Sequence, residues 1–123
     1  MHDMPHEPPV NRSHPPPPHP APAFKDLLRI ALLKIIEKEG EIHGLRLHDE
    51  LKNKYGIEIP RPVIYRALRA LEAEGLVVSR WSVKESGPAK RLYRITEEGE
   101  EFLKQRVQRV KKVLELVKKI LEE

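Results

Sequence analysis

The chain contains no cysteine, which excludes a disulfide framework and catalysis by a thiol. No apolar run reaches the ~18 residues that a membrane-spanning helix needs. The first residues also lack the charged start and apolar core of a secretory signal. No glycine-rich phosphate loop is present, and Ser86 has no histidine near it in the sequence. These absences predict a soluble cytoplasmic protein that uses no membrane and is not an enzyme.

Positive charge is in small excess overall but is concentrated in one segment. The chain has 23 Lys and Arg against 19 Asp and Glu. Residues 60–94 carry eight basic and three acidic side chains, a surplus of five, whereas residues 97–123 carry seven of each. A clustered surplus of this kind is the electrostatic footprint expected for a polyanion partner.

Residues 1–22 differ in composition from the rest of the chain. They hold nine of the twelve prolines and almost no large apolar side chain, so a disordered or polyproline-like arm is expected. Four histidines lie in this arm at irregular intervals: His2, His6, His14 and His19. Because their spacing is not that of a ligand set, neither a metal site nor a cofactor is predicted.

The ordered domain is expected over residues 23–96 and begins with helices. Its first helix starts near Phe24 in the apolar run "FKDLLRIALLKIIEKEG", which has a helical period. A second helix lies in "HGLRLHDELKNKYG", where Leu45, Leu47 and Leu51 are expected to point inward. A glycine follows each of these helices and the next one, which predicts where they end.

The third helix, residues 61–74, has one apolar side and one basic side. At ~100° per residue, Ile64 and Leu68 fall on the apolar stripe, whereas Arg66 and Arg69 fall nearly opposite. A solvated surface would account for these arginines. So would a helix that is anchored by its apolar side and enters a nucleic-acid groove with its cationic side.

Two strands are expected after this helix. The segment "LVVSRWSV" alternates at period two, and "KRLYRIT" returns after the turn "KESGPA". Trp81 in the first strand is expected to pack between the hairpin and the core rather than to stack on a ligand. Three further cations lie at or near the hairpin loop: Lys84, Lys90 and Arg91.

A long helix is expected over residues 97–123, with Thr96 as its N-cap. Apolar side chains recur along it in alternating steps of four and three residues, which is a heptad seam. The seam consists of Leu103, Val107, Val110, Leu114, Val117 and Leu121. Because a monomer would expose all six side chains, homodimerisation through this helix is predicted.

The order of these elements predicts a mainly α fold with a small β-hairpin. It is that of a winged helix-turn-helix followed by a long C-terminal dimerisation helix. In such a fold residues 61–74 form the recognition helix in the major groove of DNA. The wing, residues 84–91, would meet the DNA backbone or the minor groove. The expected partner is therefore double-stranded DNA.

Three stretches also carry a family likeness: "IHGLRLHDEL", "VIYRALRALEAEGLVVSRW" and "SGPAKRLYRITEEG". In this order they closely resemble PadR-like transcriptional regulators, over roughly residues 27–101. The resemblance implies a winged-helix DNA-binding fold, a homodimer held largely by the C-terminal helix, and repression at an operator. Many members respond to a small molecule, and the drug-binding ones have aromatic-rich dimer pores. Because the final helix offers only Phe102, an aliphatic effector or none remains open here.

Positions can be matched to the family's motifs. Tyr65 and Arg66 match its "YR", Arg91 its wing-base cation, and His43 with Gly44 its "HG", where His43 is expected to act as a structural helix cap. The usual "SPGT" is replaced by Pro60, Arg61, Pro62 and Val63. Val63 has no hydroxyl to offer to DNA, and Arg61 is expected to contact a phosphate instead. The candidate DNA-binding residues are Arg61, Tyr65, Arg66, Arg69, Lys84, Lys90 and Arg91.

The function predicted from the sequence is a sequence-specific, nucleoid-associated transcriptional regulator. Repression by a homodimer at an inverted-repeat operator is the leading interpretation. One alternative is an architectural protein that coats DNA with little sequence preference. The other is a winged-helix scaffold that binds protein, which would leave the clustered basic residues unexplained.

Overall fold

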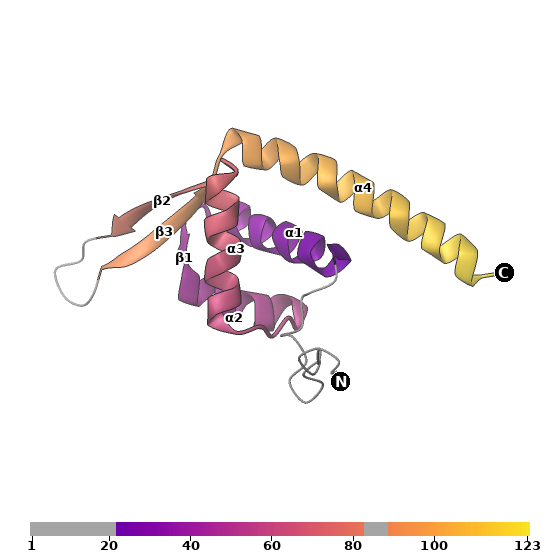
Figure 1. The fold of residues 1–123 in the computed structure, drawn as a ribbon, viewed down its shortest axis with the longest axis horizontal. Helices are drawn as coiled ribbons and strands as arrows, with labels where there is room; N and C mark the ends of the chain where they lie inside the picture. Colours follow the sequence, from indigo (N-terminus) through magenta and orange to yellow (C-terminus); the bar gives the residue numbers. More distant parts are fainter. Residues whose placement is uncertain (1–21, 83–88) are drawn as a thin grey trace, which may run out of the picture.

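A computed structural model describes residues 22–82 and 89–123. The elements follow in the order α1 (Pro22–Glu39), β1 (Ile42–His43), α2 (Gly44–Tyr55), α3 (Arg61–Ala73), β2 (Val77–Ser82), β3 (Lys90–Ile95) and α4 (Glu97–Leu121). The first three helices form the body of the molecule, the β2–β3 hairpin projects from one side, and α4 runs out past the other (Figure 1). The predicted mainly helical winged fold is confirmed. The predicted arm lies outside the described residues except for Pro22, which begins α1.

The helix ends follow from the glycines that the sequence places after them. Gly40, Gly56 and Gly75 all have positive φ, which side chains with a Cβ rarely adopt. At the end of α2, the amide of Gly56 donates to the carbonyl oxygens of Leu51 and Lys52, which satisfies the last turn. The predicted stops are confirmed.

The sheet has three strands, although the sequence predicts only a two-stranded hairpin. β3 lies in the middle and pairs antiparallel with both β2 and β1. β1 contains only Ile42 and His43, which pair with Tyr93 and Leu92. Two residues are too few to show an alternating pattern, so this strand was missed.

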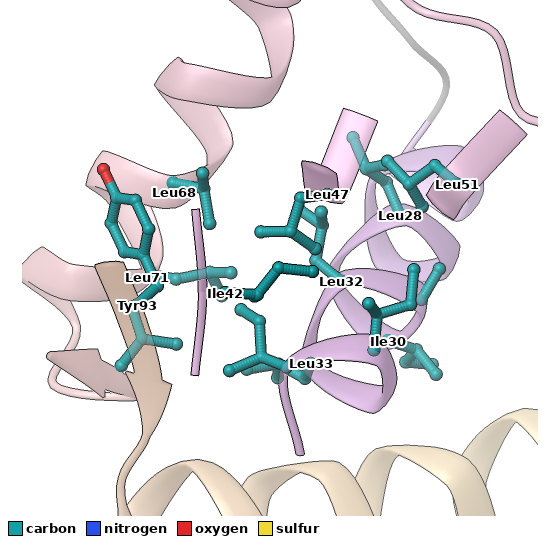
Figure 2. Close-up of a cluster of buried hydrophobic side chains, with 14 of the residues drawn as sticks. Leu28, Ile30, Leu32, Leu33, Ile42, Leu47, Leu51, Leu68, Leu71 and Tyr93 are labelled. Carbon is teal, nitrogen blue, oxygen red and sulfur yellow. The ribbon is translucent and has the colours of Figure 1, made fainter. Parts of the chain in front are cut away.

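The core is built mainly around α1. This helix is buried on most of its circumference, as expected for a helix that is apolar nearly all round. Figure 2 shows Leu68 and Leu71 of α3 on one side of the buried cluster and Leu32 and Leu33 of α1 on the other. Leu45 is wrongly predicted to point inward, because 38% of it is exposed. Apart from Tyr93, whose ring carries a hydroxyl, no buried side chain in the part of the chain that the structure describes is polar or charged.

The start of α4 is held tightly against the turn between α3 and β2. Thr96 is its N-cap, as predicted, and its hydroxyl accepts a hydrogen bond from the amide of Gly99 at 2.9 Å. The same hydroxyl donates to the carbonyl oxygen of Gly75 at 2.7 Å. A Cβ at Gly99 would collide with the carbonyl oxygen of Leu76, so only glycine allows this close approach. The direction in which α4 leaves the body is therefore set at its first turn.

The apolar seam of α4 divides into two parts. Leu103 is only 6% exposed and belongs to the core of its own chain, so the expectation that a monomer exposes all six seam residues is wrong there. Val107 and Val110 are partly buried against the same core. The other three members of the seam are exposed, and they lie on the part of α4 that extends beyond the body (Figure 1): Leu114, Val117 and Leu121.

Candidate nucleic-acid interface

The exposed side of α3 carries three arginines. Ile64, Leu68 and Leu71 anchor the opposite side and are 0%, 0% and 1% exposed. This anchoring leaves the side chains of Arg61, Arg66 and Arg69 in solvent. The division into an apolar and a basic side is the one that the helical period predicts.

Within the described residues these three arginines have no acidic partner, unlike Arg46 and Arg80. Arg80 forms two hydrogen bonds of 2.7 Å with Glu41, which lowers the pKa of that carboxyl and raises the pKa of the guanidinium. Arg46 pairs with Glu39 at 2.9 Å. Within the described residues, by contrast, no carboxylate pairs with any of the three arginines on the exposed side of α3. Their charge is therefore available to an outside partner.

The side chain of Tyr65, a residue of α3, reaches the start of α2. A Cβ at Gly44 would lie 2.5 Å from Cε1 of Tyr65, so the tyrosine ring occupies the space that a side chain would take. The two residues belong to the "HG" and "YR" motifs, and the fold brings these motifs into contact. His43 accepts a hydrogen bond from the amide of Arg46 at 3.3 Å through Nδ1, which confirms its predicted role as a helix cap.

A small polar network joins α3 to the hairpin. Glu72 accepts a 2.7 Å hydrogen bond from the hydroxyl of Ser79, and Ser79 accepts one of 2.8 Å from Nε of Arg91. A second nitrogen of Arg91 lies 3.9 Å from the Glu72 carboxylate. Arg91 was predicted as a DNA contact from its place in the wing, and the structure gives it an acidic neighbour as well. The sequence does not reveal this neighbour, because it comes from a different element.

Trp81 does not pack between the wing and the core, so that expectation is wrong. Its side chain is 58% exposed, although Val77 at the start of the same strand is 1% exposed. The strand leaves the helical body along its length, and the alternation of sides therefore no longer implies burial at its far end. The guanidinium of Arg91 lies 5.2 Å from the centre of the indole ring and holds it in a cation–π contact.

A hollow of about 650 Å³ lies between α3, the start of α2 and the hairpin. We call it the wing hollow. The aromatic residues that line it are Tyr65, Trp81 and Tyr93. The acidic and basic residues that line it are Arg69, Glu72, Lys90 and Arg91. Burial raises the pKa of Tyr93 above its usual value, and the nearby arginines oppose this rise only in part, so its hydroxyl keeps its proton at neutral pH.

The fold thus brings several of the predicted DNA-binding residues to one face. Tyr65, Arg69, Lys90 and Arg91 all line the wing hollow. Arg61 and Arg66 lie on α3 but do not line it. Lys84 lies outside the described residues, as does most of the predicted wing loop. Glu72 and Trp81 complete this face and were not among the predicted site residues.

Comparison with known proteins identifies the family. A model described as "Transcriptional regulator PadR-like family" matches residues 32–105. The chain belongs to this family. The likeness seen in the three sequence motifs is confirmed, and the family and its relatives are transcriptional regulators rather than enzymes.

Individual relatives agree with this assignment. Transcriptional regulator Rv3488 of Mycobacterium tuberculosis is 39% identical over 61 residues, which are 50% of this chain and 55% of that protein. The match therefore spans about half the length of this curated relative.

Solved structures match over more of the chain. A transcriptional regulator from Thermoplasma acidophilum is 26% identical with a TM-score of 0.72, and covers 82% of this chain and 96% of its own. A PadR family regulator from Eggerthella lenta is 27% identical with a TM-score of 0.73, and covers 81% and 87%. Bacillus subtilis PadR in complex with operator DNA is 24% identical with a TM-score of 0.60, and covers 66% of this chain and 46% of its own.

Two other kinds of site are absent from the described residues. None of their helices is both long and apolar enough to cross a membrane. No group of three or more His, Cys, Asp or Glu side chains in the described ranges is arranged to hold a metal ion.

Proposed function

We propose that this PadR-like regulator is a sequence-specific repressor that binds an inverted-repeat operator as a homodimer. The observation that carries the proposal is the exposed basic side of α3, where Arg61, Arg66 and Arg69 have no acidic partner within the described residues. Bacillus subtilis PadR, solved with its operator DNA, shares the fold and supports DNA as the partner. A regulator of this kind works in the cytoplasm at the nucleoid.

Different roles are proposed for different cations. Arg66 and Arg69 are one turn apart on α3, so both are positioned to reach the guanine O6 and N7 edge in the major groove. Arg61, at the start of the helix, is assigned to a phosphate. Phosphates are also proposed for Tyr65, Lys84, Lys90 and Arg91, because contacts from a wing mostly position a protein on the duplex.

The homodimer is proposed to form through the outer part of α4. Its exposed apolar side chains are Val113, Leu114, Leu116, Val117, Ile120 and Leu121. A patch of this kind on a charged helix marks an interaction surface. Pairing two copies there would place two recognition helices on one duplex, which is the geometry that reads an inverted repeat.

Selection of binding sites from random duplex DNA, at near-physiological salt, tests the proposal. An enriched inverted repeat is expected. The same selection with Arg66→Ala is expected to lose enrichment at one position in each half-site, whereas Arg94→Ala, on the other side of β3 from Tyr93, is expected to select the same repeat. Enrichment of a single half-site would contradict the dimer.

Two other outcomes would favour the alternative functions. Tight binding with no enriched motif and a steep loss of affinity with salt would indicate an architectural DNA-binding protein. No binding to any duplex would favour a scaffold that binds protein, and such a scaffold would tolerate loss of Arg66 and Arg69.

A further inference from the structure

We propose that a cluster of charged side chains around Phe102 sets the distance between the two recognition helices of the dimer. This distance in turn selects the spacing of the half-sites. The inference rests on the proposed function, because both the dimer and the DNA are taken from there. The cluster joins three helices, and we call it the arginine cluster. It consists of Asp26 and Arg29 of α1, Glu74 at the end of α3, and Phe102 and Arg106 of α4.

The arginine cluster fixes the direction of α4 relative to α1. Arg106 donates to both carboxylate oxygens of Asp26, at 2.7 Å and 2.8 Å. The guanidinium groups of Arg29 and Arg106 lie 5.0 Å and 4.6 Å from the ring centre of Phe102, which is within the range of a cation–π contact. Hydrogen bonds depend on direction as well as distance, whereas the apolar contacts of Leu103 with the core do not. The cluster therefore restricts an angle between helices that apolar packing alone would leave freer.

Arg29 extends this connection to the recognition helix. Its guanidinium forms an ion pair with Glu74. Glu74 is the C-cap of α3, and its amide donates to the carbonyl oxygens of Ala70 and Glu72 in the last turn of that helix. The end of α3 and the base of α4 are therefore both held on α1.

Stability does not account for Arg29. Its Nε is buried and has no hydrogen-bond partner in the described residues. A buried donor that is left unpaired costs free energy, so an apolar side chain of similar length would suit this position at least as well. Glu74 is 45% exposed, and ion pairs near the surface contribute little to stability. What Arg29 adds is one defined arrangement of the three helices.

The length of α4 makes its angle important. At the rise of an α-helix, Arg106 lies about 10 Å beyond Gly99, and Leu121 lies about 22 Å beyond Arg106. A rotation of α4 by about 10° would displace its outer end by roughly 4 Å. Successive base pairs are ~3.4 Å apart, so this displacement corresponds to about one base pair. A dimer that forms through the outer part of α4 therefore needs a fixed angle at the base of the helix in order to select one spacing.

The first test uses the full chain without DNA. The chain has no cysteine, so Ala70→Cys on the exposed side of α3 provides a single attachment site for a spin label. Electron–electron dipolar spectroscopy then measures the distance between the labels of the two copies, and one narrow distribution is expected. Adding Arg29→Met or Arg106→Met is expected to widen this distribution about twofold or to shift its mean by roughly 4 Å.

Arg46→Met is the matched control for these variants. It also removes an ion pair with α1, that of Arg46 with Glu39, but it lies on α2, away from α4 (Figure 1). No change in the distance distribution is expected for it. Circular dichroism and thermal denaturation verify that every variant keeps its fold and stability. An unchanged distribution in both cluster variants would overturn the inference. Absence of any dipolar signal between copies would mean that no dimer forms, and the proposed function would fail with it.

The second test measures half-site spacing on DNA. The duplexes carry the two selected half-sites at the selected separation, or with one base pair added or removed. The unchanged chain is expected to bind the altered duplexes about tenfold or more weakly, because the DNA must be distorted to fit. Arg29→Met and Arg106→Met are expected to lose less than about threefold, whereas Arg46→Met should discriminate as the unchanged chain does.

Equal discrimination by all of these proteins would overturn the link between the arginine cluster and spacing. If the chain binds no duplex at all, the proposed function fails, while the dipolar measurement still decides whether the cluster sets the distance between the recognition helices.

Discussion

Arg66 and Arg91 carry the same charge but lie in different surroundings. Arg66 lies on the solvent side of α3 and has no acidic neighbour in the described residues, whereas Arg91 is held by Ser79 and faces Glu72. A guanidinium group that already interacts with a carboxylate of its own chain gains less binding free energy from contact with a DNA phosphate. The two residues are therefore expected to contribute unequally to DNA binding.

Arg66→Ala is expected to weaken binding to the selected operator by about 1–3 kcal/mol while leaving binding to unrelated duplexes nearly unchanged, because a base-reading contact is lost. Fluorescence anisotropy on both duplexes measures the two affinities, with Arg94→Ala as the matched control. An equal loss on both duplexes would reassign Arg66 to a phosphate. No loss on either would remove it from the interface.

Residue 44 is glycine because the ring of Tyr65 occupies the space of a Cβ, and not because its backbone has a positive φ. Gly44→Ala is expected to lower the free energy of unfolding by about 1–3 kcal/mol, because its Cβ would meet the tyrosine ring. In a Tyr65→Ala background the same change should cost much less, since the ring is gone. Chemical denaturation of the two single variants and the double variant measures this coupling.

Gly99→Ala serves as the contrasting case. A Cβ at residue 99 would collide with the backbone oxygen of Leu76. Because this atom belongs to the backbone, no side-chain truncation removes the collision. Equal costs of Gly44→Ala with and without the tyrosine ring would show that the contact between the two motifs is unimportant for stability.

At the scale of elements, α4 serves two purposes along its length. Its first turns are part of the monomer, because Leu103 lies in the core and the guanidinium groups of Arg29 and Arg106 lie 5.0 Å and 4.6 Å from the ring centre of Phe102. Arg106 also pairs with Asp26 of α1 at 2.7 Å. Arg29 in turn forms an ion pair with Glu74, at the end of α3. The base of α4 is thus connected through α1 to the recognition helix.

The outer half of α4 is the place to test association. Leu114→Glu combined with Val117→Glu is expected to yield monomers in light scattering, because both side chains are exposed and two added charges on each copy would repel. The winged domain should keep its stability, since neither side chain belongs to the core. Lys112→Glu, on the opposite side of the helix, is the control. A dimer that survives the double substitution would place the interface elsewhere.

The hairpin shows how far a strand pattern can be interpreted from sequence. Period-two alternation predicted β2 and β3 correctly, because each strand presents alternate residues to opposite sides. The inward side was then assumed to be covered along the whole strand, which holds for Val77 and fails for Trp81. Coverage depends on where the helices end, and the pattern of one strand does not contain that information.

Over the whole molecule, the placement of charge matters more than its total. The formal net charge is only +4, yet the surplus lies on α3 and the hairpin, while α4 is nearly balanced. Binding to a polyanion releases counterions from it in proportion to the phosphates neutralised. The salt dependence of binding therefore reports how many of these cations meet the backbone.

Lys90→Ala in the dimer is expected to make the slope of log affinity against log salt shallower by about two, one phosphate contact for each protomer. Titrations at several salt concentrations measure the slope, and Lys112→Ala on α4 should leave it unchanged. A slope that Lys90→Ala does not alter would show that the start of β3 stays clear of the DNA backbone.

The helices, the residues at which they end and the winged order of elements could all be predicted from the amino-acid sequence. These features depend on the period of apolar side chains and on glycines such as Gly56 and Gly75, which act within a few residues along the chain. Three features became visible only in the folded chain: the pairing of β1 with β3, the contact of Tyr65 with Gly44, and the exposure of Trp81. Each of these depends on residues that are distant in the sequence, and local periodicity does not specify which distant residues will meet.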